Sequence, residues 1–82
     1  PAPHYVLTLV CPDRPGLVAG VAQMLALNGG NILDSQQFND TESQRFFMRV
    51  AFELPGGADR ARFETAFAGY AAANHMEWTL RS

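Results

Sequence analysis

The chain has 82 residues, of which 48% are hydrophobic and 17% are charged, and its formal net charge is −2. This length allows one domain with one modest core, spanning residues 1–82, and the composition is that of a globular chain rather than a disordered one. All six basic residues are arginines. The negative balance offers no long-range attraction to nucleic acid or to anionic membranes, so we expect neither as a partner.

The cellular setting is indicated by what the sequence lacks. Its apolar stretches are far shorter than the roughly 20 residues of a membrane-spanning helix, and its Pro-Ala-Pro start has no signal-peptide pattern. The single cysteine, Cys11, excludes an internal disulfide. We therefore expect a cytoplasmic protein.

The first two predicted elements are a strand and a helix. His4–Cys11 is rich in β-branched and aromatic residues and stops at Pro12, which cannot donate to a β-ladder. Leu17–Asn28 has apolar residues at helical spacing, with a Pro-Gly pair before it and a double glycine after it. The chain therefore begins in the order strand, helix.

The middle of the chain is predicted to be a β-hairpin. Asn31–Phe38 alternates weakly, and five polar turn residues follow it. The alternation places on one face Ile32, Asp34, Gln36 and Phe38. Arg45–Glu53 alternates clearly, with Phe47 on one face and on the other Phe46, Met48, Val50 and Phe52.

A second helix and a last strand complete the pattern. Asp59 is placed to cap a helix whose apolar residues recur at helical spacing: Phe63, Ala66, Phe67, Tyr70 and Ala71. His75–Arg81 alternates again, with Met76, Trp78 and Leu80 on one face. The order βαββαβ predicts an α+β fold, the ferredoxin-like sandwich, in which two helices cover one face of a four-stranded antiparallel sheet.

No catalytic or metal-binding pattern is visible. His4 and His75 each begin a predicted strand, and the histidine and cysteine spacings are not those of a metal site. Cys11 has no base near it in the sequence, which favours a buried structural thiol over a nucleophile. We expect no catalytic residue, no metal and no cofactor in this chain.

An RNA-binding role is an alternative, because RRM modules share the βαββαβ order. Their third-strand pattern is matched in part, at Arg45, Phe47, Val50 and Phe52. A glycine is missing at position 46 and a second stacking aromatic at position 49, and the chain has no lysine. The pattern favours core packing of this strand, with Phe47 on an interface.

The loop between the first strand and the first helix is the candidate site. Two prolines restrict it, and Pro15-Gly16 leaves free N–H groups at the positive end of a helix, which suits a carboxylate. Asp13 offers an acceptor for an ammonium group, and Asn31 offers both a donor and an acceptor. Either the two hold an amino acid by both ends, or Asp13 stabilises the loop and Asn31 caps a turn.

Several segments resemble a known family. The Asp-Arg-Pro-Gly loop with the following Leu-Val-Ala-Gly-Val-Ala, and Gly-Gly-Asn-Ile-Leu further on, resemble the ACT domain, a ligand-binding module of enzymes in amino-acid and one-carbon metabolism. More narrowly, four blocks in order, 11–18, 31–38, 45–50 and 76–78, resemble the N-terminal domain of the formyltetrahydrofolate deformylase family. The resemblance covers the whole chain.

The resemblance implies a regulatory domain that binds a small effector and dimerises. The positions that it assigns to the ligand are Asp13, Arg14, Pro15, Gly16, Leu17, Asn31 and Ile32. Many amino-acid-binding members carry Asn where this chain has Asp13; glycine and methionine are the candidate effectors. Hydrolysis of 10-formyltetrahydrofolate to formate and tetrahydrofolate, a step linked to purine biosynthesis, would belong to a C-terminal hydrolase domain outside these residues. The alternative is a stand-alone ACT regulator that acts by protein contact.

Overall fold

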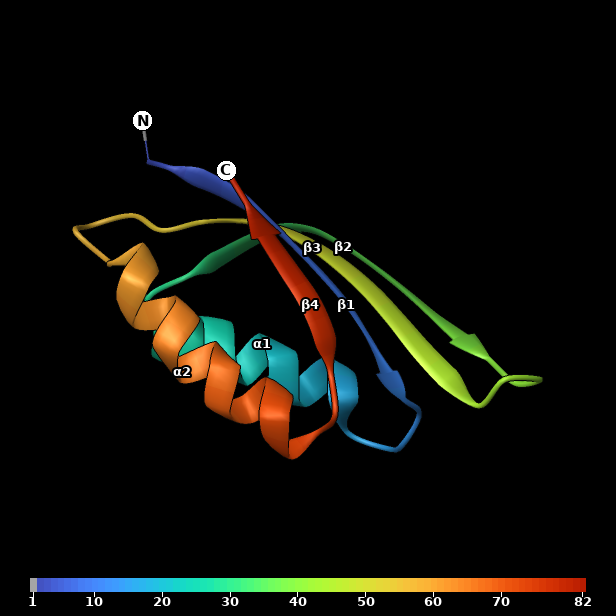
Figure 1. Ribbon diagram of the computed structural model, residues 1–82. Coiled ribbons are helices and arrows are strands. Elements are labelled where there is room, and N and C mark those ends of the chain that lie inside the picture. Colours follow the sequence, from blue (N-terminus) through green and yellow to red (C-terminus); the bar gives the residue numbers. More distant parts are fainter. Residues whose placement is uncertain (1) are drawn as a thin grey trace.

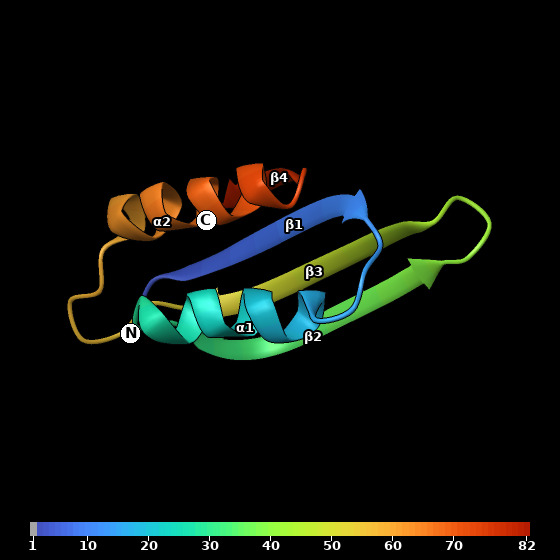
Figure 2. The ribbon, with the colours of Figure 1, turned by 90° about the horizontal axis from the view of Figure 1, so that it is seen from below.

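A computed structural model describes residues 2–82, and its six elements have the predicted order (Figure 1). The elements are β1 (His4–Pro12), α1 (Leu17–Leu27), β2 (Asn31–Asp40), β3 (Arg45–Glu53), α2 (Arg60–Ala73) and β4 (Glu77–Arg81). The strands form one antiparallel sheet in the order β2-β3-β1-β4. Both helices lie on the same face of this sheet (Figure 2). The predicted ferredoxin-like sandwich is confirmed.

The two helices begin in different ways. α2 has Asp59 at its N-cap, and the Asp59 carboxylate accepts a hydrogen bond from the Ala61 N–H at 3.0 Å, as predicted. α1 begins after Gly16, which has a φ of 89° and offers no side chain to cap the helix. Because glycine adopts this conformation at no steric cost, the chain can turn sharply into α1 at Gly16.

The last strand is shorter than the alternation predicted. His75 has a φ of 54°, and the N–H groups of His75 and Met76 donate to carbonyl oxygens of α2, at 3.3 and 2.9 Å. These bonds close the C-terminal end of the helix, as in other left-handed caps. The prediction that a strand begins at His75 is therefore wrong, and β4 begins at Glu77.

The alternation of β2 also differs from the prediction. Ile32 pairs with Phe52 and Asp34 pairs with Ala51, although Phe52 and Ala51 are neighbours on β3. The bulge at this point adds a residue to β2 and inverts the faces that follow. Ile32 therefore shares the helix side with Phe52, and its predicted place on the face of Phe38 is wrong.

The hydrophobic core lies between the sheet and the helices. Its buried members include all four predicted residues of β3 and, from the other elements, Leu7, Leu9, Cys11, Leu17, Val21, Leu25, Phe63 and Phe67. Burial raises the pKa of the Cys11 thiol above its ordinary value. This disfavours the reactive thiolate and agrees with a structural role for Cys11. Within residues 2–82, no helix is both long and apolar enough to cross a membrane.

Candidate ligand-binding site

Asp13 attaches the loop between β1 and α1 to the β2–β3 hairpin. Its backbone N–H donates to the Gln44 carbonyl oxygen at 2.9 Å. Both of its carboxylate oxygens accept from Asn39 Nδ2 at 3.0 Å. The carboxylate is exposed, and its partner Asn39 is a neutral amide that carries no compensating charge.

The start of α1 offers backbone donors beside Asp13. Gly16 makes no side-chain cap, and the first helical bond in this turn runs from the Gly20 N–H to the Gly16 carbonyl oxygen at 2.9 Å. The N–H groups that precede it in the turn are the ones that a helix leaves without an internal partner. Pro15 and Gly16 are exposed, whereas Leu17 is buried in the core. The helix start predicted to accept a carboxylate is thus exposed at Pro15 and Gly16, and Leu17 anchors it in the core.

Arg14 points to α2. Its Nε donates to Asn74 Oδ1 at 2.9 Å, and its Nη2 contacts the same oxygen. Its Nη1 donates to the Pro15 carbonyl oxygen at 3.2 Å. The guanidinium, predicted from the resemblance to face a ligand, is engaged within the chain.

Asn31 lies at the other end of the sheet. Its Nδ2 donates to Glu53 Oε1 at 3.0 Å, and His4 Nε2 lies 3.4 Å from Glu53 Oε2. β3 separates this cluster from the loop, because Asn31 pairs with its last residue and Pro12 with its first. At the rise of a β-strand this separation is about 26 Å. One chain therefore does not bring Asp13 and Asn31 together, and the same holds for Ile32.

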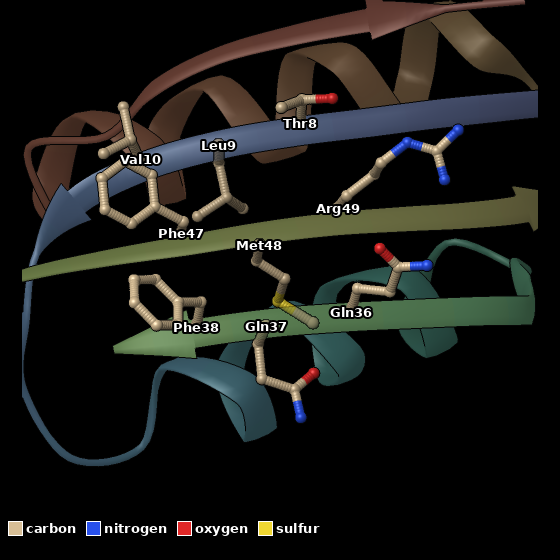
Figure 3. A pocket seen from close by; sticks show the side chains of 9 residues that line it. All are labelled: Thr8, Leu9, Val10, Gln36, Gln37, Phe38, Phe47, Met48 and Arg49. Atoms are coloured by element: carbon tan, nitrogen blue, oxygen red, sulfur yellow. The ribbon is translucent and has the colours of Figure 1, made fainter. Parts of the chain in front are cut away.

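The sheet face opposite the helices carries an aromatic pair. Phe38 and Phe47 pair across β2 and β3 with ring centroids 6.2 Å apart, and they are 62% and 40% exposed. Val10 pairs with Phe47 from β1, which completes an apolar row that we call the open-face row: Val10, Phe47 and Phe38. The row borders a groove of about 460 Å³ that Arg49 and Gln36 also line (Figure 3).

The sequence predicts Phe47 at an interface and gives Phe38 no role. The two residues meet only through the register of the β2–β3 hairpin. The sequence places both residues in predicted strands. The alternation of β2 is too weak to predict that Phe38 lies on the same face of the sheet as Phe47. The open-face row is thus a feature of the folded sheet rather than of a local motif.

The similarity of this chain to known proteins agrees with its fold. The ACT domain family matches residues 5–67. This chain is a member of the ACT domain family. ACT domains generally bind small amino-acid effectors and form pairs.

Individual relatives of this ACT domain are more specific. It is 38% identical to the formyltetrahydrofolate deformylase of Bacillus subtilis (strain 168) over 76 matched residues. The match covers 90% of this chain and 25% of the relative. It superposes on the formyltetrahydrofolate deformylase of Pseudomonas putida KT2440 with a TM-score of 0.91 and 31% identity, over 98% of this chain and 29% of that one. An ACT domain protein from Streptococcus pneumoniae shares the fold, with a TM-score of 0.83 at 24% identity over 100% of this chain and 91% of that one. The ACT domain thus spans about a quarter of the length of the deformylases it matches.

Proposed function

We propose that this ACT domain is the regulatory part of a cytoplasmic formyltetrahydrofolate deformylase. The support is its similarity to two such enzymes over nearly its whole length. The hydrolysis of 10-formyltetrahydrofolate to formate and tetrahydrofolate then requires residues outside these 82. Purified 82-residue protein should release no formate from 10-formyltetrahydrofolate above a matched blank, and measurable turnover would refute this division of labour.

The effector that we propose is a small amino acid, with glycine and methionine as the first candidates. The observation that carries this proposal is the uncapped, glycine-led start of α1 beside the exposed Asp13 carboxylate. Backbone N–H groups at a helix N-terminus favour the ligand carboxylate, and Asp13 favours its ammonium group. The two charged ends of one amino acid thus find opposite charges at one loop.

A complete site needs a second copy of the chain. β2 is an edge strand of ten residues, so its outer backbone groups are free to pair. In the antiparallel pair of β2 edges that we propose, the Asn31 end of one β2 lies beside the Asn39 end of the other, and Asn39 holds Asp13. Two equivalent sites then form, each with Asp13 from one protomer and the amide of Asn31 from the other.

The open-face row supports the same pairing. An antiparallel pair of β2 edges continues the sheet from one protomer to the other, so the open faces of both protomers, each with Phe38 62% exposed, lie on the same side. Phe47 supports the ring of Phe38 from β3. The open-face rows of the two protomers then lie on one continuous face and approach each other at Phe38, their most exposed residue.

A thermal-shift measurement tests the effector. Ligand at about 100 times its dissociation constant should stabilise the native state by roughly 2.7 kcal/mol, which is readable in a domain of this size. Asp13→Ala and Asn31→Ala should each remove the shift, whereas Glu42→Ala, an exposed acid in the adjacent turn, should keep it. If glycine, methionine and a wider amino-acid screen all leave the melting temperature unchanged, the effector proposal is wrong.

Mixing the two binding variants tests whether the site spans two protomers. In a heterodimer of Asp13→Ala with Asn31→Ala, one site carries both substitutions and the other carries neither. Calorimetry on a one-to-one mixture should therefore recover about a quarter of the wild-type sites at wild-type affinity. A site built within one chain would recover none.

Light scattering tests the pairing itself. The wild-type domain should be a dimer at micromolar concentration, and Phe47→Thr should weaken that dimer because it removes the support under Phe38. A monomer at every concentration, or a dimer that Phe47→Thr leaves unchanged, would refute the role of the open-face row.

A further inference from the structure

Arg14 joins the ligand loop to the far end of the chain. Its guanidinium bonds to Asn74, which is the C-cap residue of α2 and lies 60 positions further along. The Asn74 amide is used at both ends, because its Nδ2 donates to the Tyr70 carbonyl oxygen at 2.9 Å. A single side chain of the loop is thus bound to the last turn of α2.

The same turn of α2 also contacts α1. A Cβ added to Gly20 would lie 2.0 Å from Tyr70 Oη, so the phenol rests directly on the backbone of α1. Tyr70 Oη is buried and has no hydrogen-bond partner among the described residues. The last turn of α2 therefore touches both the loop, through Asn74, and the second turn of α1, through Tyr70.

We infer that Arg14 positions the ligand loop by binding Asn74 and does not itself contact the effector. The guanidinium donates to groups of this chain through all three of its nitrogens: Nε and Nη2 to Asn74, and Nη1 to the Pro15 carbonyl oxygen. A ligand carboxylate could form a bidentate pair with the Nε–Nη2 edge of Arg14 only by displacing Asn74. The ligand half of this inference rests on the proposed function, whereas the attachment of loop to helix does not.

The attachment holds the loop in one shape before the effector arrives. Pro12 and Pro15 already restrict the backbone on both sides of Arg14. The bond to Asn74 ties the residue between them to a regular helix. A loop held in its binding shape loses less conformational freedom when it binds, so its affinity for the effector is higher.

A double-mutant cycle separates positioning from contact. Arg14→Ala and Asn74→Ala should weaken effector binding by the same factor, about fivefold, and the double variant should be no weaker than either one. Arg62→Ala, which removes an exposed arginine from the first turn of α2, should leave the affinity unchanged. If Arg14→Ala weakens binding well beyond Asn74→Ala and the two effects multiply, Arg14 contacts the effector and the inference is overturned.

Hydrogen exchange of the ligand-free domain tests the attachment separately. The amides to follow are those of Asp13 and Gly20 near the loop and of Met76 after α2, all hydrogen-bonded here. Asn74→Ala should accelerate exchange at Asp13 and Gly20 severalfold, and Arg14→Ala should do so at Met76. Unchanged exchange at the distant amides overturns the attachment, whereas coupled exchange without amino-acid binding refutes the proposed function alone.

Discussion

Phe46 and Phe47 are neighbours in β3 and lie in opposite environments. Phe46 is 2% exposed and packs in the core beneath the helices, whereas Phe47 is 40% exposed on the open face. The pleat of one strand produces this difference, because successive side chains point to opposite sides of a sheet. The two faces thus differ in what they bury: the helix-covered face holds the core that stabilises the domain, and the open face, which the chain leaves exposed, is the surface that we propose for association.

The largest effect is expected from Phe46→Ala. Truncating a buried phenylalanine removes its apolar contacts and leaves a cavity, which costs about 3–5 kcal/mol of unfolding free energy. For a domain of this size such a loss is a large part of the whole stability. Denaturant unfolding monitored by circular dichroism measures it. A loss below about 1 kcal/mol would mean that this face does not support the fold.

Gly20→Ala should reduce stability by about 1–3 kcal/mol, because the new methyl group overlaps the phenol of Tyr70. Gly69→Ala in α2 is the matched control, since a Cβ there meets nothing within 4 Å. This control should stabilise the helix by about 0.5–1 kcal/mol. Similar effects of the two substitutions on thermal unfolding would contradict the close contact between α1 and α2.

How much the sequence predicts differs between strands for a physical reason. The bounds of β3 were predicted to the residue because four buried side chains alternate with outward ones. β2 is an edge strand with little cover on either side, so nothing forces an alternation, and the bulge near Leu33 left no trace in the sequence. Alternation of apolar and polar residues reflects the burial of one face of a strand, so it is absent from a strand that is exposed on both faces.

The candidate site was predicted in part for a related reason. The loop itself was visible because proline and glycine mark a backbone constraint locally. The partners of its side chains were not visible, because Asn39 reaches Asp13 through hairpin register and Asn74 reaches Arg14 across 60 positions. The separation of Asp13 from Asn31 likewise depends on sheet order, which no local motif contains.

Tyr70→Phe should raise stability by about 1 kcal/mol, because it removes a buried hydroxyl that lacks a hydrogen-bond partner. Burial raises the pKa of Tyr70 above its ordinary value of 10.0, so the native state holds this proton more tightly than the unfolded chain. The stability that this tighter proton binding contributes to the native state is fully present below pH 10, and it is lost as the pH rises through the native pKa of Tyr70. Chemical unfolding at a series of pH values should show that the unfolding free energy falls less steeply at alkaline pH in Tyr70→Phe than in the wild type. The fall that persists in the variant is due to Cys11, whose pKa is also raised.

Phe47→Thr should have the smallest effect on the fold and completes the comparison with Phe46. Threonine suits a β-strand, and the ring that it replaces contacts mainly Phe38 on an exposed face. The unfolding free energy of the monomer should therefore change by no more than about 0.5 kcal/mol. The measurement is denaturant unfolding at concentrations below the association range, so that the loss of a partner does not enter the result. A loss close to that of Phe46→Ala would show that the open face also stabilises the single chain, and the separation of roles between the two faces of β3 would then fail.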